Sequence, residues 1–138
     1  MFKIIPPLQI KLKLTKTRHL VCQSQINGVK AVLLIDTGAS SSCIAHSEKE
    51  TFNIEEKGQP FEASGAGKDK GKAVMGHQCD LILGRHAMGK QAFVLLDMQH
   101  INATLMNENV EPINGILGAD FLKKNHAIID YKNKVLNL

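Results

Sequence analysis

Residues 32–42 read VLLIDTGASSS, and this segment carries the strongest structural signal in the chain. An apolar run ends directly at the carboxylate of Asp36, which Thr37 and Gly38 follow. A lone charge is costly to bury, so a carboxylate at the end of a core strand usually shares its proton, accepts strong hydrogen bonds or lies in a cleft. Gly38 permits a tight turn, and Ala39 is small enough for another segment to pack over it. The structural alternative is a core strand that ends at an ordinary turn.

The length of 138 residues fits one domain with a hydrophobic core of its own. Hydrophobic residues make up 43% and charged residues 22%, a composition typical of a globular protein rather than a disordered one. The longest apolar runs, at 31–35 and 92–96, are too short to cross a bilayer, and the Pro6-Pro7 break does not fit a signal peptide. With a net charge of only +4, 4% aromatic residues and no Trp, we expect neither a nucleic acid nor a membrane as partner.

Three cysteines, Cys22, Cys43 and Cys79, are widely spread along the chain. Their odd number argues against a disulfide framework and favours a reducing, cytoplasmic setting. Cys43 with His46, and His77 with Cys79, have spacings found in parts of zinc sites, but no second well-spaced pair follows either. We therefore expect no metal or other cofactor. A cysteine protease is not indicated, because no nucleophile elbow or oxyanion motif is present.

Most of the chain alternates apolar and polar residues with a period of two, which is typical of strands buried on one face. Asn27-Gly28 is a strong hairpin signal between two such segments. The pattern predicts strands over 8–14, 19–26, 30–35, 76–83, 91–96, 127–131 and 135–138. It also predicts one or two helical turns at 47–50, a short helix near 119–124, and a connection over 98–114 with a short strand around 101–105. This many short strands with regular turns predicts a compact β barrel or sandwich.

A second motif lies near the C-terminus, where residues 113–122 read INGILGADFL. An apolar strand containing Ile116 and Leu117 closes on Gly118 and runs into the predicted short helix. Taken alone, Gly118 would be a turn glycine, and Asp120 would be a carboxylate favoured at the start of a helix by the helix dipole.

Together the two motifs resemble the retropepsin-like aspartic proteases. Asp36-Thr37-Gly38-Ala39 after apolar residues resembles their catalytic loop, and the strand ending at Gly118 resembles their apolar-apolar-glycine element. The second motif follows the first by about eighty residues, a spacing similar to that of the family. The ending, AIIDYKNKVLNL, is similar to the closing hairpin of small bacterial and eukaryotic retropepsin-like domains. The resemblance therefore covers most of residues 8–138.

This resemblance implies an all-β, closed barrel-like retropepsin fold with one or two short helices, formed by a single domain over residues 1–138. It implies that the Ile116-Leu117-Gly118 strand passes beside the catalytic loop. It also implies a homodimer, because peptide hydrolysis needs one carboxylate to take a proton from water and another to give one to the substrate carbonyl. Only Asp36 begins an Asp-Thr-Gly or Asp-Ser-Gly sequence, so the second acid has to be Asp36 of another copy, related by a two-fold axis.

The family pattern assigns a role to each residue of the loop. Asp36 would act as general base in one subunit and general acid in the other. The Thr37 hydroxyl would link the two loops across the axis, and the Gly38 amide would hold the carboxylates coplanar. Ala39 lacks the hydroxyl that some relatives place beside the carboxylates, so we expect a mildly acidic pH optimum.

The segment Ser64-Gly65-Ala66-Gly67 lies where the family places its flap, a hairpin that closes over bound peptide. Glycine suits a sharp tip that offers backbone amides, and the substrate would bind as an extended strand. The family often has a further glycine after this tip, where Lys68 stands here. The alternative is an ordinary surface hairpin.

The sequence therefore indicates an aspartic endopeptidase whose partners are a second copy of itself and a peptide or protein substrate. In viral relatives the terminal strands interleave at the dimer interface, and residues 135–138 are the segment that would do so here. The rival hypothesis is a catalytically silent retropepsin-like module that binds peptide or only dimerises.

Overall fold

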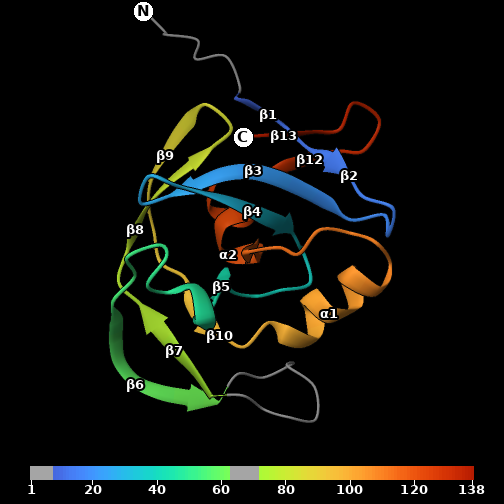
Figure 1. Cartoon of the computed structure of the whole chain (residues 1–138). Coiled ribbons are helices and arrows are strands. Elements are labelled where there is room, and N and C mark those ends of the chain that lie inside the picture. Colours follow the sequence, from blue (N-terminus) through green and yellow to red (C-terminus); the bar gives the residue numbers. More distant parts are fainter. Residues whose placement is uncertain (1–7, 63–71) are drawn as a thin grey trace, which may run out of the picture.

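The computed structural model describes residues 8–62 and 72–138 and is built mostly of β-strands (Figure 1). The strands are β1 (Gln9–Lys11), β2 (Lys13–Leu14), β3 (Leu20–Ile26), β4 (Val29–Ile35), β5 (Cys43–Ala45), β6 (Glu56–Glu62), β7 (Lys72–Gly76), β8 (Cys79–Leu83), β9 (His86–Gln91), β10 (Val94–Leu96), β11 (Gly115–Leu117), β12 (Ile128–Asp130) and β13 (Val135–Asn137). The helices are α1 (Gln99–Asn107) and α2 (Ala119–Lys124), with one 3₁₀ turn, η1 (His46–Glu48). None of the helices in these described ranges has the length and apolar character needed to span a membrane. The predicted all-β class is confirmed.

The strands form two sheets. The smaller has the order β1-β13-β12, and the larger has the order β6-β7-β10-β5-β11-β4-β3-β8-β9, with β2 paired to β3. In the larger sheet β11 lies between β4 and β5, parallel to β4 and antiparallel to β5. Gly115 therefore lies opposite Leu33, and Leu117 opposite Ile35. This arrangement puts the end of the second motif beside the end of the first.

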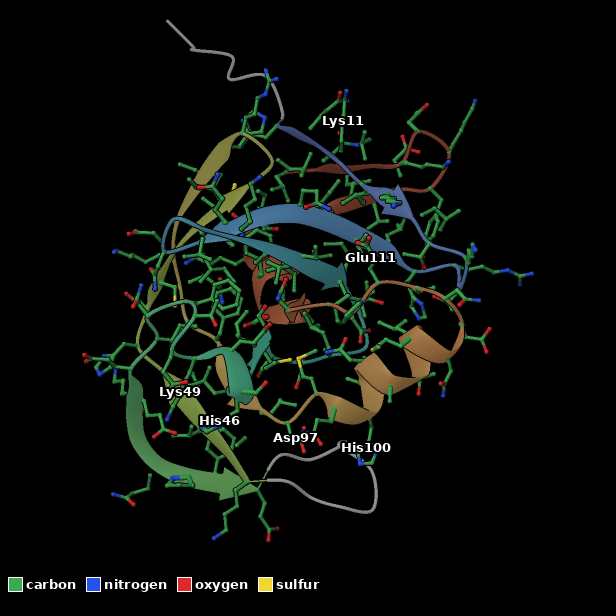
Figure 2. The ribbon with its side chains drawn as sticks, viewed as in Figure 1. Lys11, His46, Lys49, Asp97, His100 and Glu111 are labelled. Carbon is green, nitrogen blue, oxygen red and sulfur yellow. The ribbon has the colours of Figure 1, made fainter. Side chains whose placement is uncertain are left out.

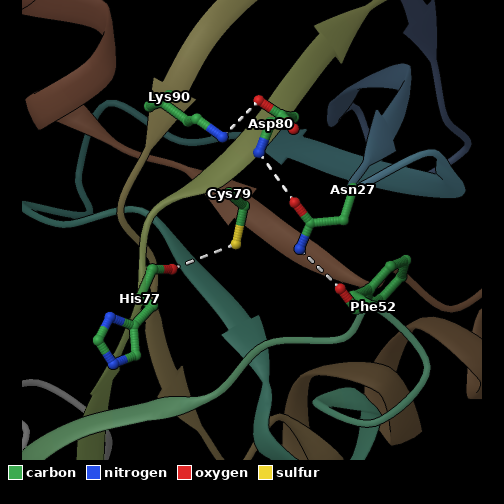
Figure 3. A network of polar contacts seen from close by, with 6 residues as sticks. All are labelled: Asn27, Phe52, His77, Cys79, Asp80 and Lys90. Carbon is green, nitrogen blue, oxygen red and sulfur yellow. Dashed lines mark hydrogen bonds and ion pairs between the residues drawn. The ribbon is translucent and has the colours of Figure 1, made fainter.

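The β3–β4 hairpin turns at Asn27 and Gly28, which both have positive φ, at 50° and 82°. This is the backbone that a two-residue hairpin turn requires and that an Asn-Gly pair adopts most easily. The side chain of Asn27 also donates to the Phe52 carbonyl (2.8 Å) and accepts from the Asp80 amide (2.9 Å), as Figure 3 shows. These contacts fix the hairpin against β8 and against the segment that follows η1.

Two hydrophobic clusters lie on opposite faces of β4. Leu33 belongs to the first cluster, which includes Phe52 and Phe93, and Leu34 belongs to the second, which lies under α1. The alternation of the strand explains the division, because neighbouring residues point to opposite faces. Helix α1 contributes the buried side chain of Leu105 to the second cluster. It covers that face at the lower right of Figure 1.

The prediction of a connection with a short strand over 98–114 is wrong, because residues 99–107 form α1. Met98, Ile101 and Leu105 have the i, i+3, i+7 spacing of a helix, and this was the available signal. The Asp97 carboxylate accepts a hydrogen bond from the Gln99 amide (2.9 Å) and so satisfies one free donor at the start of the helix. The many polar residues of the segment hid this spacing.

The expectation of a closed barrel is also wrong for the described residues. Strands β6 and β9 end the larger sheet, and each pairs with only one neighbour. Figure 1 shows β9 near the top of the molecule and β6 at the bottom, so the sheet curves without joining its two edges. Inside–outside alternation is the same in a barrel, a sandwich and a curved open sheet, so the sequence pattern cannot tell them apart.

Two further differences concern the terminal strands. The single strand predicted over 8–14 is divided into β1 and β2 at Leu12, whose amide donates to the Lys134 carbonyl (2.9 Å). The expectation that residues 135–138 interleave with a second copy is wrong for this structure. Strand β13 is the central strand of its sheet, with β1 on one edge and β12 on the other, so both of its edges are already paired.

Candidate active site

Asp36 lies where β4 leaves the core. Ala31, Leu33 and Leu34 of the strand before it are buried, while Asp36 itself is half-buried. Its amide donates to the Leu117 carbonyl (3.0 Å), and its Oδ1 accepts a hydrogen bond from the Gly38 amide (2.9 Å). The Ala39 amide closes the turn on the Asp36 carbonyl (3.2 Å). An amide of the loop therefore orients the Asp36 carboxylate at the C-terminal end of β4.

Gly118 brings the second motif against this loop. A Cβ atom at Gly118 would lie 2.6 Å from the Ala39 carbonyl oxygen and 2.9 Å from the carbonyl carbon of Ser41. Its φ of −98° is open to any residue, so the requirement for glycine comes from packing and not from backbone conformation. Just after it, the Ala119 amide donates to the Ala39 carbonyl (2.7 Å). The structure thus brings together two motifs that lie 82 residues apart, at Asp36 and Gly118.

A contact between Ser42 and Asp120 holds the two motifs together, and the sequence did not reveal it. Ser42 is 1% exposed. Its hydroxyl accepts from the Gly118 amide (2.9 Å) and donates to Asp120 Oδ1 (2.7 Å), and its amide donates to the same oxygen (2.9 Å). Asp120 does lie in the first turn of α2, as its helix-start position suggested. Nothing in the sequence indicated that its carboxylate accepts two hydrogen bonds from the other motif.

We expect the Asp120→Ala variant to be less stable than the wild type by about 1–2 kcal/mol, because two buried donors of Ser42 lose their acceptor. Asp120→Asn should keep most of the stability, since its side-chain oxygen can still accept both bonds. The measurement is the free energy of unfolding in urea at one fixed protein concentration. Equal losses in the two variants would show that the carboxylate acts through its charge and not through these hydrogen bonds.

An open groove of about 450 Å³ lies over Asp36. Its lining comes from the catalytic-loop region, β5, β6, β10, β11 and the α1 region, and consists of Asp36, Gly38, Ala39, Ser40, Ser41, Cys43, Phe61, Glu62, Val94, Leu96, Asp97, His100, Ile101 and Ile116. Phe61 and Ile101 are large apolar side chains that are 41% and 37% exposed. Figure 2 shows Asp97 and His100 close together at the start of α1. The groove therefore combines one oriented carboxylate with apolar walls, which suits an extended peptide.

The thiol of Cys43 lies in the groove lining and is 4% exposed. Burial, with the added effect of the negative charges of Asp36 and Asp120, raises the pKa of this thiol to about 12. The thiol is therefore neutral at physiological pH and poorly suited to act as a nucleophile.

This raised pKa makes an alkaline loss of stability the expected result. The unfolded thiol has an ordinary pKa near 9.0, so above that pH the unfolded state releases a proton that the folded state keeps. The contribution of the Cys43 thiol to the free energy of unfolding is fully present below pH 9. It declines as the pH rises towards 12, by at most about 1.4 kcal/mol per pH unit. Urea unfolding at several pH values between 8 and 11 should show a shallower decline for Cys43→Ala than for the wild type. Parallel curves would contradict the raised pKa.

The remaining predicted residues are placed as follows. Thr37 and Gly38 are exposed at the tip of the catalytic loop, and Ile116 and Leu117 are buried in β11. The predicted flap residues Ser64, Gly65, Ala66 and Gly67 lie outside the described residues. The strands before and after them, β6 and β7, pair in antiparallel register.

The two Cys–His pairs do not come together. His46 bonds through Nε2 to Glu56 (2.8 Å), near Lys49, which Figure 2 also labels. Cys79 donates weakly to the His77 carbonyl (3.4 Å), as seen in Figure 3. Within residues 8–62 and 72–138, no three His, Cys, Asp or Glu side chains are grouped closely enough to hold a metal ion.

Comparison with solved structures gives the same fold. The retroviral protease-like domain of Ddi1 from Leishmania major matches with a TM-score of 0.61 and 20% identity, covering 86% of this chain and 86% of that one. A retropepsin-like aspartic protease from Rickettsia conorii matches with a TM-score of 0.59 and 16% identity over 99% and 96%. The EIAV protease complexed with the inhibitor HBY-793 matches with a TM-score of 0.54 and 17% identity over 86% and 98%. At these identities the likeness shows the fold alone.

No curated protein matches the sequence. The sequence model of the family described as "gag-polyprotein putative aspartyl protease" matches residues 22–124, which contain both motifs and the groove lining. With most of its length matched and a retropepsin-like fold, the chain belongs to this aspartyl protease family.

Proposed function

We propose that this protein is an aspartic endopeptidase that acts as a symmetric homodimer. The observation that carries the proposal is the position of Asp36, which is oriented by the Gly38 amide at the base of an open, apolar-walled groove. Membership of the aspartyl protease family supports the same reaction.

The proposed reaction uses one Asp36 from each copy. Two carboxyl groups in contact do not both ionise readily, so the pair shares one proton. The ionised member takes a proton from water, and the protonated member donates to the carbonyl oxygen of the scissile peptide bond. Water attacks directly, and no covalent intermediate with the enzyme is formed.

The need for a second copy follows from the chemistry and from the surroundings of Asp36. Among the described residues, no other carboxyl group is hydrogen-bonded to Asp36. Thr37 and Gly38 are exposed beside it, so the tip of the loop is accessible to the same loop of a second molecule. A two-fold axis near these residues would bring two identical acids into contact.

The three buried, unbridged thiols of Cys22, Cys43 and Cys79 support a reducing, cytoplasmic setting for the enzyme.

The test combines mass and activity over a range of protein concentrations. Sedimentation equilibrium gives the fraction of dimer, and cleavage of a mixed peptide library gives the specific activity. We expect the specific activity to rise in proportion to the dimer fraction, and a hydroxyl-containing peptide mimic of the tetrahedral state to inhibit it. Full activity of a monomer would contradict the shared-proton mechanism. A dimer that binds the mimic but cleaves no peptide would instead be a catalytically silent peptide-binding module.

A further inference from the structure

A second hollow, of about 290 Å³, lies apart from the groove over Asp36. It is formed by β2 with the turn after it, by β3 and β4, and by the segment that follows α1. Its lining consists of Lys13, Leu14, Thr15, Lys16, Val21, Gln23, Val32, Asn109, Val110, Glu111 and Ile113. Figure 2 labels Glu111 beyond one end of α1 and Asp97 and His100 at the other end. The helix therefore lies between the two hollows.

Hydrogen bonds hold the walls of this hollow in place. In the turn after β2, the Thr15 amide donates to the His19 carbonyl (2.8 Å), and the His19 amide donates to Thr15 Oγ1 (3.1 Å). On the opposite wall, the side chain of Asn102 accepts from the Ile113 amide (2.8 Å) and donates to the Ile113 carbonyl (3.1 Å). The Val110 amide donates to the carbonyl of Leu105, the buried residue of α1 (2.8 Å). The hollow is therefore preformed, as binding sites usually are.

The floor of the hollow is apolar and its rim carries positive charge. Val21 and Ile113 are buried, and both belong to the cluster under α1. Lys13 and Lys16 line the rim, and Glu111 is the single acidic residue of the lining. In the described part of the chain, neither lysine takes part in an ion pair. The site therefore offers two free ammonium groups beside apolar surface.

We propose that this hollow binds an acidic peptide segment, in which an apolar side chain packs on the floor and neighbouring carboxylates meet Lys13 and Lys16. The electrostatic attraction between two opposite charges is stronger beside a surface of low polarity than in water. A nucleic acid fits less well, because the lining contains no aromatic side chain on which bases could stack.

The position of the hollow makes this segment part of the substrate, and this step rests on the proposed function. Val32 of β4 lines the hollow, and Asp36, which follows the end of β4, lines the groove four residues further along the chain, a span of about 13 Å for extended backbone. Because α1 and the buried side chains of Leu34 and Leu105 lie between the two hollows, a peptide that occupies both has to pass around the helix and needs more than four residues. The hollow would therefore recognise acidic residues more than four positions from the bond that is cleaved.

The binding test uses the full chain with Asp36→Asn, so that no probe is cleaved. The probe is the end-capped pentapeptide glycine–glutamate–leucine–glutamate–glycine, compared with its glutamine counterpart. In NMR titrations of ¹⁵N-labelled protein we expect the glutamate peptide to shift the amide signals of Val21, Gln23 and Val110 and to bind about fivefold more tightly than the glutamine peptide. Equal binding of both peptides would overturn the proposal. Stronger shifts of the same amides by a single-stranded oligouridine would overturn it in favour of a nucleic acid.

Matched double variants test whether Lys13 and Lys16 cause the preference for the glutamate peptide. K13Q/K16Q should lose the preference for the glutamate peptide, whereas K123Q/K124Q, which removes two exposed lysines of α2, should keep it. An equal loss in both variants would mean that net charge attracts the peptide, and the proposal would fail.

A cleavage test separates this proposal from the proposed function. With wild-type protein, we compare substrates that carry glutamates at increasing distances, beyond four residues, from a cleaved bond. One of these spacings should raise kcat/KM about fivefold, and K13Q/K16Q should remove this gain. Binding at the hollow without any cleavage of peptides would leave the recognition site supported and would count against the endopeptidase. Cleavage that is insensitive to these glutamates would count against the hollow as a substrate site and leave the endopeptidase intact.

Discussion

Asn in place of Asp36 is expected to lower kcat/KM for peptide cleavage by about a thousandfold, which is the scale of general acid–base catalysis. An amide can neither take a proton from water nor donate one as a carboxylic acid does. The substitution keeps the shape of the side chain, and its oxygen can still accept the hydrogen bond from the Gly38 amide. The variant should therefore fold and associate as the wild type does while losing its activity.

The measurement is cleavage of the mixed peptide library by both proteins at matched concentration, with the mass of each followed by sedimentation. Asp97→Asn is the matched control, because Asp97 is also a carboxylate in the groove lining but is exposed and lies beside α1. This control should retain nearly all of the activity. Equal cleavage by the wild type and Asp36→Asn would remove Asp36 from the mechanism.

Local signals in the sequence were sufficient for the hairpin that leads to Asp36, but not for β5 and β6, which also line the groove. The Asn27-Gly28 turn and the apolar residues before Asp36 predicted the β3–β4 hairpin, because hairpin turns and strand alternation depend on neighbouring residues. The short helix predicted near 119–124 is also present, as α2. The pairing of the two motifs could be expected only from the family resemblance, since no local pattern specifies which distant strand lies beside β4.

Features that depend on contacts between distant residues were missed. The Ser42–Asp120 contact joins residues 78 positions apart. Taken alone, Ser42 is typical of a loop and Asp120 of the start of a helix. Helix α1 was missed because few of its side chains are apolar, and its burial depends on the cluster beneath it. The hollow beside Lys13 and Lys16 is likewise formed only when β2 meets the segment after α1. For the same reason, alternation along single strands could not show that the sheet stays open.

The second large effect is expected for Gly118→Ala, which should be less stable than the wild type by about 3 kcal/mol or more. The added methyl group would overlap the Ala39 carbonyl oxygen at 2.6 Å and the backbone of Ser41 at 2.9 Å. Backbone atoms cannot rotate away as a side chain can, so the catalytic loop itself has to move. A displacement of about 1 Å in a catalytic group can lower the rate about a hundredfold, and we expect a loss of kcat/KM on that scale in the folded variant.

Gly76→Ala provides the matched control, because it makes the same chemical change at another buried glycine. There the added methyl group would meet the Ile54 Cγ2 methyl at 2.6 Å and the Phe93 carbonyl oxygen at 3.3 Å, and the Ile54 side chain can shift. We expect a cost of about 1 kcal/mol and little change in kcat/KM, since Gly76 does not line the groove. Urea unfolding and peptide cleavage are measured for both variants at the same protein concentration. If Gly118→Ala proved as stable and as active as Gly76→Ala, the close approach of β11 to the catalytic loop would not be what holds Asp36 in place.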